Sequence, residues 1–430
     1  MNFDYKALIL LINYQLSTIN YQLSTIKMKR SGTATLPLHY GKVPPWLYER
    51  MSVLGLSIVE VMLADYGKDE VLKRLADPFW FQSFGAVMGM DWHSSGITTS
   101  VMGALKRSIN PRSKELGIYI CGGKGRFSKE TPNELLIIAD KTGLNGTELV
   151  RASKLSAKVD NTAIQDGYQL YLHNFIVSDE GNWAVVQQGM NDADGTARRY
   201  HWHSENMESF VDEPHKGIQG INRGQILNLT AHEAQESRKG ILEISHTNSE
   251  KIMQDFANLI LPAHHDVRAS DVDLKKLGTL LYMTRENQPE NFEELLLLKG
   301  VGPRTLQSLA LVSEVIHGAP SRFRDPARFS FAHGGKDGHP FPVPINVYDE
   351  TINILQKGIE KSKLGNSDKL QSINKLHSII SEAEKNFTPD FDINEVIEEE
   401  RQNSWRFGGK TVFGDAEKPS KPKPIQLSLF

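Results

Sequence analysis

The hydrophobic pattern of this chain changes period twice, and this change limits the folds that it can adopt more than any other feature. Up to about residue 160 the apolar residues mostly recur with helical spacing, and we expect helices at 44–66 and Gly96–Ile109. From Gly167 the spacing becomes that of strands, which predicts a hairpin and a third strand at Tyr168–Val177, Trp183–Gln188 and Tyr200–His203. After Thr230 the pattern is helical again. The sequence therefore predicts an α+β protein, in which a mixed N-terminal region with a small antiparallel β sheet precedes a mainly α-helical region.

The length of 430 residues predicts several domains, because one hydrophobic core rarely serves so long a chain. Residues 13–19 (NYQLSTI) are repeated as residues 20–26, which indicates a translated leader upstream of Met28; the alternative is an appended pair of strands. We expect a non-native or disordered leader at 1–27, an α/β core domain at 28–228, a helical domain at 229–318, an Arg/Gly-rich loop followed by helices (347–362 and 368–386) at 319–405, and a flexible tail at 406–430.

Composition favours a location inside the cell. The single cysteine, Cys121, cannot form an internal disulfide, and no apolar run approaches the roughly 20 residues that cross a bilayer. We therefore expect a cytoplasmic protein with no membrane partner. The formal net charge of −3 argues against a generally basic nucleic-acid binder. Any affinity for DNA, and any association with the nucleoid, must then depend on local patches of positive charge.

The last five residues resemble the peptide with which bacterial polymerases and repair proteins bind the β sliding clamp. They are Gln426, Leu427, Ser428, Leu429 and Phe430. Three apolar side chains at the end of an extended tail need a groove to receive them, and the alternating lysines and prolines of residues 418–424 lengthen the tether. The resemblance implies the sliding clamp as a partner. The alternative is that the peptide folds back onto its own core.

Residues 295–310 resemble the helix-hairpin-helix motif of DNA repair and recombination proteins. Gly300 and Gly302 allow a tight turn between two apolar helices, and the helix that begins at Pro303 directs free amide groups at a phosphate oxygen. Lys299 and Arg304 add positive charge at the same place. The resemblance implies binding of the DNA backbone without recognition of bases. The alternative is an ordinary helical hairpin, or a hairpin that contacts protein.

The segment after this motif suggests a further activity. Base-excision glycosylases often carry a catalytic aspartate beyond a helix-hairpin-helix, and Asp325 stands in that region, beside the DNA-binding candidates Arg322 and Arg324. Arg304 replaces the lysine of glycosylase-lyases, and a guanidinium cannot form a Schiff base, so only a monofunctional glycosylase is compatible. The alternative is that Asp325 is a helix cap next to Pro326.

A glycine-rich segment follows a short strand expected at Leu116–Cys121. Backbone amides and two cations in this segment are candidates to hold a phosphate of DNA: Gly122, Gly123, Lys124 and Arg126. The glycine spacing is not that of an ATP-binding P-loop. A plain flexible turn is equally consistent with the sequence.

Two groups of histidines and carboxylates are candidates for a divalent metal, Mg²⁺ or Mn²⁺. The first is His201, His203 and Glu205, which share one face of an extended strand, and the second is His264, His265 and Asp266. Polar residues on neighbouring elements are expected to complete the first site: Asp160, Asp166, His173, Gln187 and Gln188. The candidate catalytic residues are Asp166, His173, Glu205 and Asp325. Each histidine is alternatively an ordinary hydrogen-bonded residue.

Four strings of residues resemble a known family. Residues 32–51 (GTATLPLHYGKVPPWLYERM), 91–97 (DWHSSGI), 166–190 and 331–340 (FAHGGKDGHP) are similar to the bacterial and archaeal family called domain of unknown function 763, and the resemblance extends over about 32–387. It implies neither a fold nor a reaction. In the second string, Ser94 or Ser95 is either a helix N-cap or a contact for a substrate.

Three hypotheses for function follow. The first is a metal-dependent DNA phosphodiesterase, a nuclease that is recruited by the β sliding clamp and that uses the metal to activate water. The second is a non-enzymatic, clamp-associated DNA-binding adaptor. The third is a monofunctional DNA glycosylase that uses Asp325.

Overall fold

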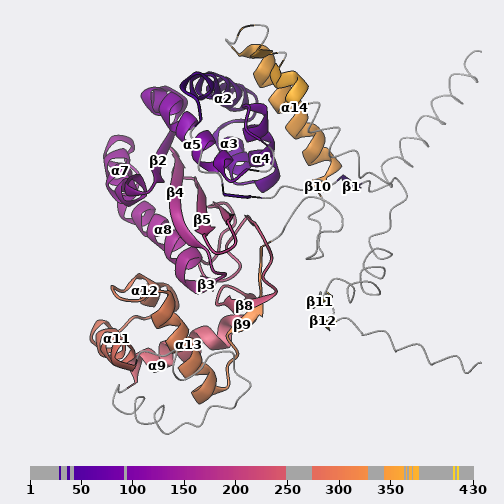
Figure 1. Cartoon of the computed structure of the whole chain (residues 1–430). Coiled ribbons are helices and arrows are strands. Elements are labelled where there is room, and N and C mark those ends of the chain that lie inside the picture. The colour runs from indigo at the N-terminus through magenta and orange to yellow at the C-terminus, as the bar shows by residue number, and fades with distance from the viewer. Residues whose placement is uncertain are drawn as a thin grey trace, which may run out of the picture.

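Five antiparallel strands form the central sheet of the protein, in the order β2-β4-β5-β6-β7. Figure 1 labels β2, β4 and β5 of this sheet. The structure, a computed structural model, describes residues 29–30, 36–38, 43–91, 94–247, 274–327, 343–362, 365, 368–369, 371–376, 410–411 and 414–415. The strands of the sheet are β2 (Ile118–Lys124), β4 (Gln169–Ser178), β5 (Trp183–Asn191), β6 (Thr196–His203) and β7 (Gly217–Gln219).

Alternation along β6 divides its side chains between two layers of the protein. His201 faces the first layer, where its Nδ1 lies 3.2 Å from the carbonyl oxygen of Leu75. Its neighbour Trp202 faces the second layer and donates from Nε1 to Asp160 at 2.9 Å. A residue of β6 therefore meets one layer or the other according to whether its position is odd or even.

The first layer consists of helices that cover one face of the sheet. They are α2 (Pro45–Tyr66), α3 (Lys68–Leu75), α4 (Pro78–Val87) and α5 (Gly96–Ile109), with α14 (Ile345–Lys361) packed on α2. Proline at the first position opens both α2 and α4, and the side chain of Asp77 caps α4 by accepting from the Trp80 N–H at 2.7 Å. Apolar side chains of these helices form a buried cluster with Ile176 and Val186 of the sheet.

The second layer combines helices with a second, three-stranded antiparallel sheet of order β3-β8-β9. Its elements are α7 (Arg126–Thr142), α8 (Gly146–Lys158), the π-helical turn η2 (Val159–Ala163), β3 (Ile164–Gln165), β8 (Gln225–Asn228), α9 (Gln235–His246), α11 (Leu274–Asn287), α12 (Phe292–Leu297), α13 (Pro303–His317) and β9 (Arg322–Arg324). Short elements complete the described chain: β1 (Lys29–Arg30), η1 (Asn110–Arg112), α6 (Ser113–Leu116), η3 (His232–Ala234), β10 (Val343–Pro344), β11 (Lys410–Thr411) and β12 (Gly414–Asp415).

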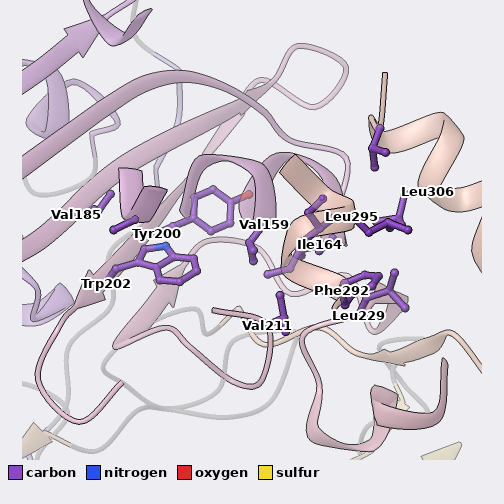
Figure 2. Close-up of a cluster of buried hydrophobic side chains, with 14 of the residues drawn as sticks. Val159, Ile164, Val185, Tyr200, Trp202, Val211, Leu229, Phe292, Leu295 and Leu306 are labelled. Carbon is purple, nitrogen blue, oxygen red and sulfur yellow. The ribbon is translucent and has the colours of Figure 1, made fainter. Parts of the chain in front are cut away.

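One buried apolar cluster runs through the second layer without a break. Figure 2 shows Tyr200 and Trp202 of the central sheet beside Val159 of η2, with Leu295 of α12 and Leu306 of α13 further along the same cluster. The boundary predicted near residue 228 therefore falls between β8 and α9, and the cluster continues across it. The helices that follow the sheet therefore share its core, and burial of their apolar faces against it stabilises both.

The predicted α+β class is confirmed, with antiparallel sheets of five and three strands. The helices α2 and α5 lie where the sequence places them, and β4 lies within one residue of its predicted bounds. β5 and β6 are longer than predicted, and β2 includes Gly122–Lys124, which were expected to form a loop. The three-stranded sheet was not predicted, since its strands are two to four residues long. The leader at 1–27 and most of the predicted helix at 368–386 and of the tail at 406–430 lie outside the described residues.

Candidate functional site

The end of the α12–α13 pair carries the residues of the predicted DNA contact. α12 ends at Leu297 and α13 begins at Pro303, and Gly300 between them has a φ of +93°, a left-handed conformation that favours glycine. Lys299, Gly300, Pro303 and Arg304 are all exposed. We call residues 298–304 the hairpin tip; it presents two cations and the first turn of a helix on one exposed surface.

Buried contacts fix the hairpin tip on the body of the protein. The Val301 side chain is 1% exposed, and its carbonyl oxygen accepts from the Lys158 ammonium at 2.6 Å. The Gln165 side-chain amide donates to the carbonyl oxygen of Pro303 at 2.7 Å. The tip is thus held by α8 and β3.

Gly302 differs from Gly300 because its backbone does not require glycine. Its φ is −135° and its ψ −178°, an extended conformation that any residue adopts. Its N–H donates to Thr305 Oγ1 at 2.7 Å, which is the half of a capping box that a glycine N-cap can form. A Cβ added at Gly302 would meet no described atom within 4 Å. Neither the backbone conformation nor a contact with a described residue requires glycine at this position.

The three-stranded sheet brings further cations near the hairpin tip. β3, whose Gln165 contacts Pro303, pairs with β8, and β8 pairs with β9. Because neighbouring strands lie about 4.8 Å apart, β9 lies about 10 Å from β3. Arg324 of β9 is exposed and Arg322 is half-buried. Residues predicted from two separate segments therefore lie in one region.

The predicted phosphate cradle around Gly122 is formed only in part. The Gly122 N–H donates to the Glu134 carboxylate at 2.5 Å, and its carbonyl oxygen accepts from Lys106 at 2.9 Å, so both backbone groups have partners within the protein. Gly122 and Gly123 have positive φ and lie in β2, with Gly123 half-buried. Lys124, Gly125 and Arg126 beyond them are exposed.

The predicted metal ligands lie on both faces of the sheet. His201 and His203 face the first layer, whereas His173 faces the second, where its Nε2 lies 2.9 Å from Ser153 Oγ. Glu205 is largely exposed, and its carboxylate lies 3.7 Å from His203 Nδ1. No three histidine, cysteine, aspartate or glutamate side chains among the described residues converge on a point where they could hold a metal ion. The sheet itself separates His173 from the other two histidines.

Burial keeps these histidines neutral. It lowers the pKa of His201 well below its ordinary range, and the nearby Arg199 guanidinium lowers it further. Burial also lowers the pKa values of His173 and His203, against the opposing effects of Gln187 and Glu205 respectively. A neutral imidazole can accept a proton or bind a metal, but at His173 both ring nitrogens already lie within hydrogen-bond distance of Ser153 and Gln187.

His173 belongs to a buried chain of polar contacts in the second layer. Its Nδ1 lies 2.7 Å from Gln187 Oε1, and the Gln187 amide donates to the Asp160 carboxylate. Asp160 also accepts from Trp202 Nε1 and lies 2.5 Å from His215 Nε2. Asp160, His173 and Gln187 were expected to complete a metal site with His201, His203 and Glu205. In the structure they contact one another instead, and the polar groups of this chain are hydrogen-bonded to other protein groups.

Asp166 and Asp325, both predicted as catalytic, meet at one buried arginine. Arg198 donates to Asp166 at 2.7 Å and forms two hydrogen bonds to Asp325, at 3.0 and 2.7 Å. Asp325 also accepts from the backbone N–H groups of Arg223 and Ala327. Burial raises the pKa of Asp166, an effect that Arg198 opposes, while the two carboxylates outweigh burial and raise the pKa of Arg198. With four hydrogen bonds, Asp325 joins the segment after α13 to β6.

Arg199 is a residue that sequence analysis did not single out. Its side chain is fully buried in the first layer, and its partners are neutral: Thr98 Oγ1 at 2.7 Å, Gln82 Oε1 at 2.8 Å and Gln219 Oε1 at 3.1 Å. Burial lowers its pKa to about 9. The signal in the sequence is the pair Arg198-Arg199 within an apolar strand. Because side chains alternate along a strand, one arginine of such a pair must enter the core on each face of the sheet.

Two sets of predicted residues lie outside the described part of the chain. They are the metal candidates His264, His265 and Asp266 and the clamp peptide Gln426, Leu427, Ser428, Leu429 and Phe430. None of the described helices is long and apolar enough to cross a membrane.

Comparison with known proteins agrees with the family resemblance seen in the sequence. No curated protein and no solved structure matches the chain. A family match covers residues 32–343, which span the central sheet, the first layer up to α5, the second layer and the hairpin tip. It ends before α14 and so is shorter than the range up to 387 that the resemblance suggested. The chain belongs to the family described as protein of unknown function (DUF763).

Proposed function

We propose that this protein binds DNA through the sugar-phosphate backbone, and that the hairpin tip makes the contact. The observation that carries the proposal is Gly302, which has an extended backbone and open space around it at the start of a 15-residue helix. A phosphate oxygen can approach such a helix end closely, where the positive end of the helix dipole favours an anion. The exposed Lys299 and Arg304 add two charges beside it.

Binding without cleavage is the form of this function that the contacts support best. A nuclease of the predicted kind needs a metal held by converging side chains, and His173 is separated from His201 and His203 by the sheet. A glycosylase needs an aspartate free to act on its substrate, whereas Asp325 is 2% exposed and accepts four hydrogen bonds. We therefore favour the adaptor among the three hypotheses.

The clamp peptide supplies the second half of the proposal. Residues 426–430 match all five positions of the clamp-binding pattern and follow a lysine- and proline-rich tether. A tethered contact raises the effective concentration of the hairpin tip on DNA that carries a clamp. The protein would thus connect the clamp to DNA, with two separate surfaces that can be removed independently.

The test is a titration of labelled duplex DNA with the full chain at several salt concentrations, followed by fluorescence anisotropy. Gly302→Val should fold normally, because φ is extended and its Cβ would meet no described atom within 4 Å. We expect it to bind DNA about tenfold more weakly, a loss of about 1.4 kcal/mol. Lys299→Ala with Arg304→Ala should lower the slope of log K against log salt by about 2.

Lys73→Ala is the matched control, because Lys73 is exposed on α3 in the first layer, on the other side of the sheet. Wild-type affinity in all the hairpin-tip variants would refute the DNA-binding role of the tip. Repeating the titration with Mg²⁺, with Mn²⁺ and with a chelator separates the adaptor from the nuclease. DNA binding that persists in the presence of the chelator, with the DNA uncut throughout, supports the adaptor hypothesis. Cleavage of the DNA that requires a metal would instead support the nuclease hypothesis.

A further inference from the structure

The first turn of α5 meets the guanidinium of Arg199 inside the first layer. We infer that this junction is a binding site for a phosphate group, distinct from the DNA contact at the hairpin tip. Arg199 Nε donates to Thr98 Oγ1 at 2.7 Å, and Thr98 is the third residue of this 14-residue helix. We call the surroundings of Arg199 and Thr98 the α5 site.

Arg199 has a buried positive charge that no described carboxylate neutralises. Its hydrogen-bond acceptors are a hydroxyl and two amide oxygens, and its guanidinium carbon lies 4.9 Å from the centre of the Phe81 ring. A fully buried ion without a counter-ion destabilises a fold, which is why such charges are normally paired. The neighbouring Arg198 follows that rule, with two aspartates on one guanidinium. Arg199 departs from it in the same strand.

The helix end makes the same place more positive. Cations stabilise the C-terminal end of a helix and anions the N-terminal end, because the peptide dipoles add along the axis. Here a guanidinium lies against the first turn of α5. The hydroxyl of Ser95, which precedes the helix, donates to the carbonyl oxygen of Pro37 at 2.7 Å instead of capping α5. The Arg199 guanidinium and the positive end of the α5 dipole thus share one location, and both would stabilise an anion bound between them.

Unsatisfied polar atoms lie around the same guanidinium. Among the described residues, Arg199 Nη2, Gln219 Nε2 and His201 Nε2 have no hydrogen-bond partner, although all three side chains are at least 98% buried. Gln219 is opposite Arg199 in the β6–β7 pair, and His201 is two residues along the same face of β6. Buried polar atoms are nearly always hydrogen-bonded. The guanidinium and amide N–H groups left over are donors, which suits an oxyanion with several acceptor oxygens. His201 Nε2 is an acceptor, because Nδ1 donates to the Leu75 carbonyl oxygen, and it can donate to an anion only after it takes up a proton.

A series of side-chain contacts links Arg199 to an exposed lysine. Gln188 accepts from Thr98 and donates to the Ser95 carbonyl oxygen at 3.0 Å and to the Tyr171 hydroxyl. Tyr171 is half-buried, and the ammonium of the exposed Lys124 lies 5.5 Å from the centre of its ring. Lys124 is thus the exposed cation at the outer end of this chain of contacts, and the same lysine belongs to the glycine-rich segment that the sequence marked for phosphate.

The test measures thermal unfolding of the full chain with increasing sodium phosphate, against sodium chloride at matched ionic strength. We expect phosphate to raise the Tm of the wild-type protein in a saturable way. Arg199→Met should abolish this rise. Lys106→Met is the matched control: Lys106 is a half-buried cation near the other end of α5, it pairs with Glu134, and its loss should leave the phosphate response unchanged.

A second variant decides the matter if Arg199→Met does not fold. Lys124→Ala changes only an exposed side chain, and it should shift the midpoint of the phosphate response to at least severalfold higher concentration. A wild-type Tm that does not respond to phosphate, or a response unchanged in both variants, would overturn the inference. A parallel titration with a nucleoside 5′-monophosphate identifies the source: a lower midpoint than inorganic phosphate assigns a phosphate ester, and an equal or higher one assigns free phosphate.

Discussion

Arg198 and Arg199 are adjacent in β6, yet their guanidinium groups lie on opposite faces of the central sheet with opposite electrostatic surroundings. Arg198 binds Asp166 and Asp325 at 2.7 Å each, whereas the partners of Arg199 are uncharged. Both side chains are fully buried. One residue completes the core of the second layer, and the other leaves a charge in the first layer that the described protein does not neutralise.

The two arginines should therefore respond differently to the same substitution. Arg198→Met leaves two buried aspartates without their cation, and we expect it to lower the free energy of unfolding by about 3–5 kcal/mol. Arg199→Met removes an uncompensated charge and should be nearly neutral or stabilising. Urea denaturation of both variants gives the comparison. Equal losses would mean that Arg199 is as structural as Arg198.

Stability should fall as the pH drops below about 6.5, because three buried histidines have lowered pKa values in the folded protein. The unfolded chain then binds protons that the folded chain does not, which favours unfolding by up to about 1.4 kcal/mol per pH unit for each histidine. Unfolding free energies measured from pH 7.5 to 5 test this. His201→Gln should reduce the slope of the free energy of unfolding against pH. His232→Gln, at a side chain that is 73% exposed, should leave this slope unchanged. A pH-independent stability in this window would contradict the assignment of neutral histidines.

Asp325→Asn separates a structural role from a catalytic one. Asparagine cannot form the charged pair with Arg198 and has only one acceptor oxygen for four donors, so we expect a loss of about 1–3 kcal/mol in the free energy of unfolding. Base release from damaged duplex should be undetectable in both the wild-type protein and the variant. The glycosylase hypothesis would be supported if the wild-type protein released a damaged base and Asp325→Asn lost this activity without a change in its free energy of unfolding.

Removal of residues 426–430 should abolish binding to the β sliding clamp and leave DNA binding intact. The measurement is surface plasmon resonance on immobilised clamp, with anisotropy on duplex DNA in parallel. Leu429→Ala with Phe430→Ala removes apolar contacts without shortening the chain and should have the same effect. Clamp affinity that persists in both proteins would rule out the peptide as the contact.

The hydrophobic period was sufficient to predict the α+β class, helices such as α5 and the β4–β5 hairpin, because these elements are long and their apolar residues repeat regularly. The hairpin tip was also predictable, since the glycines and cations of 299–304 are contiguous in the chain. Short strands such as β3 and β9 were not, because they form only when distant segments pair. The sequence therefore predicted the elements whose stabilising contacts lie within one segment of the chain, and missed those that need a distant segment.

The roles of the histidines, aspartates and arginines depended on the tertiary structure. The sequence places His173, His201 and His203 on strands of one sheet, but alternation and strand register together decide that His173 lies on one face of that sheet and the other two histidines on the opposite face. In the same way, Asp325 lies 127 residues from Arg198 along the chain and meets it only through folding. Pairing between distant side chains sets their burial, their partners and their pKa values, so the fold decides whether a buried arginine meets carboxylates, as Arg198 does, or uncharged groups, as Arg199 does.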